Sequence, residues 1–358
     1  MYSDLTTLCV ERGNSIRDAI SRMDKGKVGI VLVVDAERRL LGTVTDGDIR
    51  RALLSNVALR EPVCTLLARK AGTRYALPIT ARAGQDSSTY LSLLKQHNIL
   101  HLPLVDNDGR VVGLIGLDDF VPDGVLPLQA VVMAGGAGSR MRPLTEELPK
   151  PMLPVGDRPL MEIIIQQLRD AGIKRVNVTT HHQSEKITEH FGDGRNFGVE
   201  LSYVTEDRPL GTAGALGLME KIRDTVLVIN GDILTKVDFR TMVAFHREHH
   251  ADLTLAVRRY DVHLPYGVVD CEGISVRRLK EKPSLNFLVN AGIYLLEPTV
   301  YRYIPNGERF DMTDLIQRLL DAGRPVVSFP IWEYWLDIGE PNDYERAQED
   351  VKHGKLTK

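Results

Sequence analysis

The chain has 358 residues, of which 43% are hydrophobic and 26% are charged, and its formal net charge is -3. A chain of this length is ordinarily divided between two domains of about 100–200 residues, each large enough to bury a core. Residues 1–127 hold 16 Lys+Arg against 15 Asp+Glu, and the remainder holds 29 against 33, so neither half is the basic body of a nucleic-acid-binding protein.

Cysteine spacing and hydropathy indicate the compartment. The three cysteines, Cys9, Cys64 and Cys271, form no ligand pair, and an odd number suits a reducing environment. No apolar run approaches about 18 residues, and no basic segment followed by an apolar core opens the chain. We therefore expect a cytoplasmic protein with neither a membrane nor a nucleic-acid partner.

The first 120 residues contain a tandem duplication, in which segments 30–53 and 101–121 align at an offset of 71. Matched pairs include Asp35 with Asp106, Gly42 with Gly113, and Asp48 with Asp119. Each copy reads as a strand, a polar turn, a second strand and a helix, and a helical apolar pattern precedes it. The duplication predicts two small α+β repeats, over residues 1–60 and 61–126.

Beyond a boundary marked by Pro122, Gly124 and Pro127, short apolar strands alternate with helical patterns. The expected strands cover 128–133, 175–180, 201–205, 225–229 and 253–257. The expected helices cover 159–171, 213–222 and 242–249. This alternation predicts a Rossmann-like α/β domain over 127–358 with a mostly parallel sheet, whose ligands bind beyond the carboxyl ends of the strands.

A glycine-rich segment follows the first of these strands and reads AGGAGSR over 134–140, with Lys150 ten residues further on. It matches neither the P-loop nor the dinucleotide-binding fingerprint. Its glycines would let backbone N–H groups approach an anion closely. Arg140 can hold a phosphate with a forked set of donors, and Lys150 adds a mobile point charge. The segment alone is compatible with a phosphate site or with a solvated turn.

Over 135–152 the chain resembles the signature G-G-x-G-x-R-(M/L)-x-P-L-T…P-K-P-(M/L) of the sugar-nucleotide pyrophosphorylase family. Further motifs follow in the family's order over roughly 128–345. The sequences NGD at 230–232 and WLDIG at 335–339 resemble its metal-binding aspartates, and LGTAG at 210–214 its nucleoside-binding loop. The sequences YGV at 266–268, EKP at 281–283 and NAGIY at 290–294 resemble its sugar-phosphate contacts. Motifs in this order make the resemblance specific, although each alone is weak.

The resemblance implies Mg²⁺-dependent transfer of a nucleoside monophosphate from a nucleoside triphosphate to a sugar 1-phosphate, with release of pyrophosphate. Arg140 would hold the triphosphate, Lys150 would bridge the two reacting phosphates, and Asp232 and Asp337 would hold Mg²⁺. The implied nucleotide-binding residues are Ala134, Gly135, Gly136, Gly138, Ser139, Glu206, Gly211 and Thr212. The implied sugar-phosphate-binding residues are Gly267, Glu281, Lys282 and Asn290. No general base is required, because a sugar phosphate is already ionised near neutral pH.

These residues also have structural interpretations. Asp232 after a buried strand is compatible with a helix N-cap, Asp337 with a turn, and Glu281 and Lys282 with a solvated ion pair. A non-catalytic nucleotide sensor of the same fold would be expected to lose the catalytic basic residues or the metal-binding aspartates, and all are present. A glycosyltransferase should show Asp-x-Asp at a strand end, where this chain reads NGD.

The base and the sugar are less strongly indicated. Glu206 precedes the nucleoside-binding loop, and its carboxylate suits the paired N1–H and N2–H₂ donors of guanine. This favours GTP over UTP, although a uridylyl branch carries a similar acidic residue. The arrangement of two small repeats before the α/β domain resembles that of glucosamine-1-phosphate guanylyltransferases. The catalytic part alone also resembles mannose-1-phosphate guanylyltransferases and N-acetylmuramate-1-phosphate uridylyltransferases.

The sequence GTVTDGDI at 42–49 resembles the CBS-domain signature G-x-(V/I)-(T/S)-x-x-D-(I/L). The resemblance implies that Thr45 and Asp48 hold the ribose of a regulatory nucleotide. In the second copy Gly116 replaces the hydroxyl residue, so we expect one ligand for the pair. A ligand-free dimerisation module is the alternative. The resemblance also implies a homodimer or a higher homo-oligomer.

Overall fold

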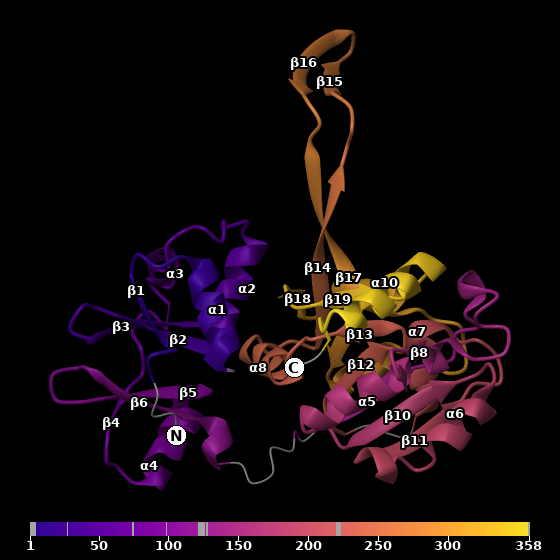
Figure 1. Cartoon of the computed structure of the whole chain (residues 1–358), viewed down its shortest axis with the longest axis horizontal. Coiled ribbons are helices and arrows are strands. Elements are labelled where there is room, and N and C mark those ends of the chain that lie inside the picture. The colour runs from indigo at the N-terminus through magenta and orange to yellow at the C-terminus, as the bar shows by residue number, and fades with distance from the viewer. Residues whose placement is uncertain are drawn as a thin grey trace. The chain divides into compact units, whose positions relative to one another are not determined.

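The computed structural model describes residues 5–26, 28–73, 75–97, 99–120, 126, 128–219 and 223–356. The chain divides into two compact units (Figure 1), one formed by Met1–Leu126 with Asp238–His249 and the other by Pro127–Val237 with His250–Lys358. The expected boundary markers Pro122, Gly124 and Pro127 lie outside the described residues. Among the helices that are described, none is long and apolar enough to span a membrane.

The first unit contains two copies of one α+β motif. In the first copy, α1 (Ile16–Gly26) precedes β2 (Ile30–Val34) and β3 (Leu40–Thr45). In the second, α4 (Ser87–His97) precedes β5 (His101–Val105) and β6 (Val111–Gly116), and every bound is displaced by the predicted 71 residues. Strands β1 (Cys9–Glu11) and β4 (Ala81–Arg82) complete the two three-stranded sheets, and α3 (Cys64–Arg69) lies between the copies in the chain. The tandem pair of small α+β modules is confirmed.

The two copies differ after their second β-hairpin strand. In the first copy Thr45 caps α2 (Asp46–Leu54), because its hydroxyl accepts a hydrogen bond from Asp48 N while the Asp48 carboxylate accepts one from Thr45 N. In the second copy Asp119 still accepts from Gly116 N. Gly116 has no hydroxyl to complete the reciprocal pair, and the described residues of this copy end in the 3₁₀ turn η1 (Leu117–Phe120).

The second unit is organised around a seven-stranded sheet with the order β11-β10-β7-β12-β17-β14-β18. Its strands are β7 (Gln129–Met133), β10 (Arg175–Thr180), β11 (Glu200–Thr205), β12 (Val226–Asn230), β14 (Leu253–His263), β17 (Ser284–Leu296) and β18 (Val326–Ile331). The first four in the order run parallel, β17 is antiparallel to both of its neighbours, and β18 is parallel to β14. The predicted mostly parallel α/β sheet is confirmed.

Apolar faces of the helices bury the central strands. Leu315 and Leu319 of α9 (Met312–Asp321) pack in one core cluster with Val131 of β7 and Val228 of β12, all fully buried. Further helices of this unit are α5 (Leu160–Asp170), α6 (Ser184–Phe191) and α10 (Pro341–Lys352), whereas α8 (Phe239–Glu248) belongs to the first unit. The short strands β8 (Pro154–Val155) and β9 (Arg158–Pro159) form a separate pair. Strands β7 and β12 read as continuous apolar runs because both of their faces are covered.

The helix expected over 213–222 is shorter than predicted. The structure has one helical turn, α7 (Gly211–Gly214), followed by the 3₁₀ turn η6 (Ala215–Leu218), and residues 220–222 lie outside the described part. A Cβ added at Gly214 would lie 2.7 Å from the carbonyl oxygen of Glu308. The glycines that permit this close approach also weaken a helix, which is why the apolar spacing misled the prediction.

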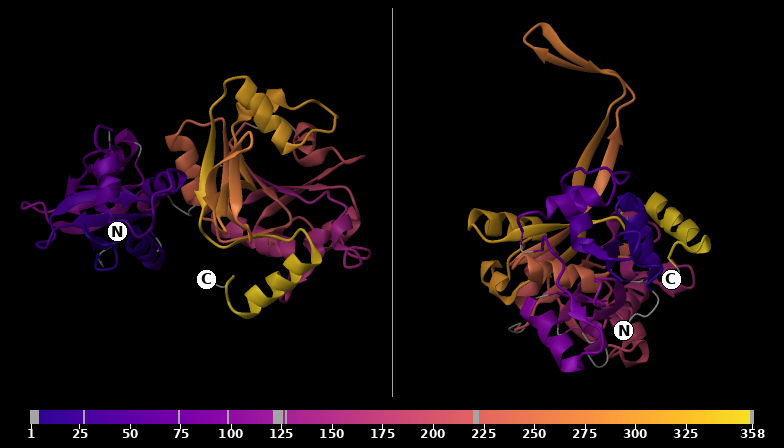
Figure 2. Two further views of the ribbon diagram at one scale, coloured as in Figure 1. Left: turned by 90° about the horizontal axis from the view of Figure 1, so that it is seen from above. Right: turned by 90° about the vertical axis from the view of Figure 1, so that its left-hand side faces the viewer.

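Strands β14 and β17 continue beyond the sheet as a two-stranded ribbon that ends in the hairpin β15 (Val268–Glu272) and β16 (Ser275–Lys280). We call residues 259–290 the arm. Figures 1 and 2 show that it extends away from the seven-stranded sheet of its own unit. The strand expected over 253–257 is therefore longer than predicted, and the arm is not predicted from the sequence. The apolar run stops at Val257, and alternating polar and apolar residues continue the same strand beyond it.

Candidate active site

A lysine–aspartate pair lies at the carboxyl ends of the central strands. Gly231, directly after β12, donates its N–H to the carbonyl of Met133 at the end of β7. A Cβ at Gly231 would lie only 2.7 Å from that carbonyl oxygen, so the close approach requires glycine. Asp232 comes next, and Lys150 Nζ donates to its Oδ2 at 2.6 Å. The two side chains are 11% and 27% exposed, so the ion pair is sheltered but remains reachable from solvent.

A second aspartate reaches the same place from the C-terminal part of the chain. Strand β13 (Ile233–Thr235) pairs with β19 (Trp335–Asp337), which sets Asp337 opposite Ile233, and Ile338 N donates to the Asp232 carbonyl at 3.0 Å. Burial, assisted by the neighbouring Asp232 carboxylate, raises the pKa of Asp337 to about 6. Lys150 and Arg140 oppose that rise. Two carboxylates close enough to influence each other's ionisation favour a cation.

The chemistry of these side chains suits a hard divalent cation. Two carboxylates offer the oxygen ligands that Mg²⁺ prefers, and Mg²⁺ usually completes its shell with water and substrate phosphates. Asn230 Oδ1, two residues before Asp232, is buried and has no hydrogen-bond partner within the described part of the chain. The same part contains no group of three or more His, Cys, Asp or Glu side chains that would hold a metal by themselves. The arrangement therefore fits an ion shared with phosphates.

The glycine-rich loop leaves β7 through the buried Ala134, whose N–H donates to Thr179 O. Gly138 has a φ of +63° and begins the 3₁₀ turn η3 (Ser139–Met141), and the Thr145 hydroxyl donates to its carbonyl at 2.8 Å. A Cβ at Gly138 would lie 2.9 Å from Thr145 Cγ2. The positive φ and this close approach both require glycine. Gly136, Ser139 and the Arg140 side chain are exposed, which leaves this stretch of loop open to a ligand.

Glu206 lies against this loop. Its side chain is buried, and burial raises the pKa of its carboxyl group. Oε2 accepts a hydrogen bond from Leu210 N at 2.8 Å. A Cβ at Gly135 would lie 2.6 Å from Oε1. The structure thus brings Gly135 and Glu206 together, and it leaves one carboxylate oxygen free of the Leu210 hydrogen bond.

Gly211 and Thr212 have a structural connection that the sequence analysis missed. Gly211 has a φ of +80°, and Thr212 N donates to Oδ1 of Asp311 at 3.0 Å. The Thr212 hydroxyl accepts from Met312 N at 2.8 Å. This loop is therefore tied to the first turn of α9, with Asp311 as the connecting residue. Asp311 also takes part in the capping box of α9 with Asp314. Aspartate three residues before another aspartate, ahead of an apolar helical pattern, is a signal of a helix start that could have identified it.

The four residues predicted to bind the sugar phosphate divide into two places. On the arm, Lys282 N donates to the Tyr266 carbonyl, and a Cβ at Gly267 would lie 3.0 Å from Glu281 Oε2. These motifs flank β15 and β16, which Figure 1 shows at the far end of the arm from β12 and β13. Asn290 lies at the base of the arm, where its Nδ2 donates to the Tyr294 hydroxyl. Within one chain, the arm motifs are not beside the Lys150–Asp232 pair.

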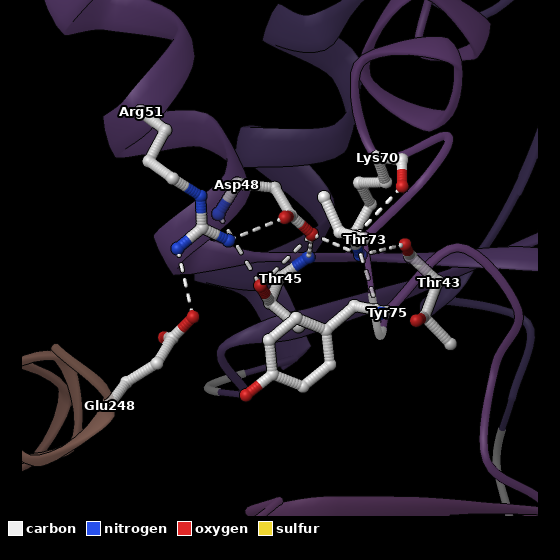
Figure 3. A network of polar contacts seen from close by, with 8 residues as sticks. All are labelled: Thr43, Thr45, Asp48, Arg51, Lys70, Thr73, Tyr75 and Glu248. Carbon is white, nitrogen blue, oxygen red and sulfur yellow. Dashed lines mark hydrogen bonds and ion pairs between the residues drawn. The ribbon is translucent and has the colours of Figure 1, made fainter.

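A second polar cluster lies in the first α+β copy (Figure 3). The buried Asp48 carboxylate accepts hydrogen bonds from the Thr45 hydroxyl at 3.0 Å, from Lys70 Nζ at 2.6 Å and from the Arg51 guanidinium at 2.7 Å. Arg51 also donates to Glu248 at the end of α8, in the same unit. The structure brings Thr45 and Asp48 together. Lys70 and Arg51 lie outside the signature and are not predicted from it.

Comparison with protein families finds two matches. The model of a family described as nucleotidyl transferase matches residues 129–354, and the CBS domain model matches residues 3–55 and 91–122. The first match contains the Lys150–Asp232 pair, Asp337, the glycine-rich loop and the arm. The second contains Thr45, Asp48 and Arg51.

Known relatives match about three fifths of the chain. The UTP–glucose-1-phosphate uridylyltransferase of Synechocystis is 36% identical over 242 residues, which cover 62% of this chain and 62% of that protein. This chain therefore spans less than two thirds of the length of that relative. The D-glycero-alpha-D-manno-heptose 1-phosphate guanylyltransferase of Aneurinibacillus thermoaerophilus is 32% identical over 229 residues, which cover 63% of this chain and 99% of that protein. A crystal structure from Bacillus anthracis, described as a glucose-1-phosphate thymidylyltransferase, superposes with a TM-score of 0.52 at 26% identity, covering 62% of this chain and 94% of that one.

Proposed function

Since the chain belongs to the nucleotidyl transferase family and carries CBS domains in its N-terminal part, we propose that it transfers a nucleoside monophosphate from a nucleoside triphosphate to a sugar 1-phosphate. The observation that carries the proposal is the Lys150–Asp232 pair, with Asp337 beside it, at the carboxyl ends of β7 and β12. We assign residues 127–358 to the transferase domain, and residues 1–60 and 61–126 to the two CBS repeats.

The reaction joins two anions, so charge neutralisation and positioning dominate the work of the protein. A phosphate oxygen of the sugar 1-phosphate attacks the α-phosphorus of the triphosphate, and the bond from that phosphorus to the β-phosphate oxygen breaks to release pyrophosphate. Lys150 lies where it can bridge the attacking phosphate and the α-phosphate once its partner Asp232 is engaged elsewhere. The exposed Arg140 can turn onto the β- and γ-phosphates and stabilise the leaving charge.

We propose Asp232 and Asp337 as the residues that hold Mg²⁺. The ion would supply charge neutralisation at the phosphates. With Asp232 engaged by the ion, the Lys150 ammonium, which is now paired with Asp232, would be available to the reacting phosphates. A cation held here would also favour the ionised form of Asp337, whose pKa burial raises.

For the base we favour guanine. Glu206 lies against the glycine-rich loop, and its Oε1 is the oxygen that the Leu210 hydrogen bond leaves available. A carboxylate accepts hydrogen bonds only, and guanine offers N–H donors on its Watson–Crick edge. The alternative is a uridylyltransferase. Relatives named for each of the two activities have similar identity to this chain, 36% and 32%.

For the sugar we favour glucosamine 1-phosphate, on the resemblance of the domain arrangement alone. We also propose that a regulatory nucleotide binds at Thr45 and Asp48 in the first CBS repeat. There Lys70 and Arg51 hold the Asp48 carboxylate, and both are suited to receive the phosphates of such a ligand.

The test is pyrophosphate release in the presence of Mg²⁺, with each nucleoside triphosphate combined with glucosamine 1-phosphate, mannose 1-phosphate and N-acetylmuramate 1-phosphate. Turnover with GTP and one sugar supports the full proposal. Turnover only with UTP keeps the reaction class and selects the uridylyl alternative. Nucleotide binding without turnover in any combination, measured by calorimetry, would instead identify a non-catalytic sensor.

A further inference from the structure

The arm has an apolar face and a polar face. Residues directly opposite each other on antiparallel strands share a face, and successive residues alternate between faces. On the ribbon, Tyr260 lies opposite Phe287, and Val262 lies opposite Leu285. The intervening pair, Asp261 and Asn286, is polar. Tyr260 and Phe287 are 58% and 52% exposed, so the apolar face is turned to solvent in the single chain.

The tip of the arm repeats this pattern. Val269 lies opposite Leu279, and Cys271 lies opposite Val276, whereas the pair between them joins Asp270 to Arg278. Val269 and Leu279 are 50% and 64% exposed. A sheet with this alternation ordinarily packs its apolar face against something.

An uncovered arm of this kind is not expected to be stable by itself. It comprises 32 residues, and none of them is buried. Of the 17 large hydrophobic side chains that are exposed in the described part of the chain, ten belong to the arm. Two-stranded ribbons without a packed face are marginally stable in water, and apolar surface concentrated in this way marks an interaction site.

The arm also carries the Glu281-Lys282 motif. Lys282 has a φ of +43°, a conformation that L-residues rarely adopt and that persists where function or packing maintains it. That turn sets Lys282 next to Tyr266 and brings Glu281 against Gly267. The phosphates that such a cation would contact belong at the Lys150–Asp232 pair, away from the tip of the arm (Figures 1 and 2).

We propose that two copies of this chain exchange arms, so that Glu281 and Lys282 of each copy complete the sugar-phosphate site of its partner. A two-fold exchange uses the same two surfaces on both copies and leaves no arm uncovered. Charge favours a contact of arm with body: the arm has five Lys+Arg against four Asp+Glu, and the other residues from 128 onward have 24 against 29. The inference rests on the proposed function for the identity of the ligand that the arm contacts.

The decisive experiment is intersubunit complementation. A Lys150→Ala chain and a Lys282→Ala chain are co-expressed with different tags, and the heterodimer is isolated by two affinity steps. With exchanged arms, one of its two sites has an intact body and an intact arm, so we expect about half of the wild-type turnover while each homodimer is inactive. If the arm acts within its own chain, the heterodimer is inactive.

A matched heterodimer has the opposite expectation. A chain with both Lys150→Ala and Lys282→Ala, paired with a wild-type chain, has a defect in each site when the arms are exchanged and is inactive. It retains about half of the wild-type turnover if each arm serves its own chain. Activity in the first heterodimer and none in the second therefore supports the exchange. Activity in the second and none in the first overturns it.

An independent measurement does not require activity. Sedimentation equilibrium should show a wild-type dimer that Phe287→Ser weakens at least tenfold, while Leu288→Ser, equally exposed at 53% but on the polar face, leaves it intact. A monomeric wild type, or equal effects of the two substitutions, would overturn the exchange. A dimer with this pattern but without turnover on any substrate pair would leave the exchange standing and reject the proposed function instead.

Discussion

Adjacent glycines of the glycine-rich loop, Gly135 and Gly136, provide a matched pair of substitutions. Neither has a positive φ, so alanine is compatible with the backbone at both positions. The added methyl group differs in what it meets. At Gly135 it would lie 2.6 Å from Glu206 Oε1, whereas at Gly136 no atom lies within 4 Å.

The expected cost follows from how Glu206 is held. The carboxylate is buried, and Oε2 accepts the Leu210 N–H at 2.8 Å. Burial and this hydrogen bond both restrict rotation of the Glu206 side chain. In Gly135→Ala the new methyl group would displace the carboxylate. This breaks or bends the hydrogen bond from Leu210 and leaves a buried group unsatisfied, at a cost of about 1–3 kcal/mol. Gly136→Ala should change the free energy of unfolding by less than about 0.5 kcal/mol.

Urea unfolding followed by tryptophan fluorescence measures this difference. Both tryptophans of the chain, Trp332 and Trp335, belong to the second unit, so the signal reports on the unit that contains the glycines. The urea midpoint of Gly135→Ala should fall with an unchanged slope, and its KM for the nucleoside triphosphate should rise. Equal midpoints for the two variants would refute the placement of Glu206 against Gly135.

Three further outcomes test other parts of the structure. Lys150→Met should lower kcat by at least about 100-fold with an unchanged urea midpoint, because the phosphates lose their bridging cation; turnover within threefold of wild type would remove Lys150 from the site. Thr45→Val should destabilise the first unit by about 1 kcal/mol in calorimetry, because half of the α2 capping box is lost, and it should weaken any nucleotide effect on the rate; an undiminished effect would place the regulatory ligand elsewhere. Burial lowers the pKa of His101 to about 4 from an unfolded value near 6.5, so the unfolded chain binds the proton first and stability should fall by up to about 3 kcal/mol as the pH drops from 6.5 to 4; His101→Gln should remove that part of the loss in calorimetric scans, and identical pH profiles would contradict the assignment.

The local part of the fold could be predicted from the sequence. The two α+β copies have bounds displaced by the predicted 71 residues, because each copy is specified by apolar spacing and turn residues within about 40 positions. The central parallel strands were also predictable, since strands buried on both faces read as continuous apolar runs. Thr45 and Asp48 were recognisable as a pair because the capping box that joins them is local.

Long-range pairing was less accessible to sequence reasoning. Asp337 is next to Asp232 because β13 pairs with β19, and spacing alone does not reveal that contact. Lys70 joins Asp48 from 22 residues away, outside the signature that identifies Asp48. The arm combines alternating polar and apolar residues with an exposed apolar face, and the hydrophobic pattern of a single chain does not say which surface covers that face.

The β13–β19 pairing has a consequence for biosynthesis. Contacts in the first unit's sheets, such as β2 with β3, join nearby residues, so those sheets can form while the ribosome is still translating the rest. Ile233 must wait for Asp337, which emerges only when the chain is nearly complete. The two aspartates are therefore among the last groups to meet. A nascent or truncated chain that ends before β19 would have the sheets of its first unit in place and its candidate active site still incomplete.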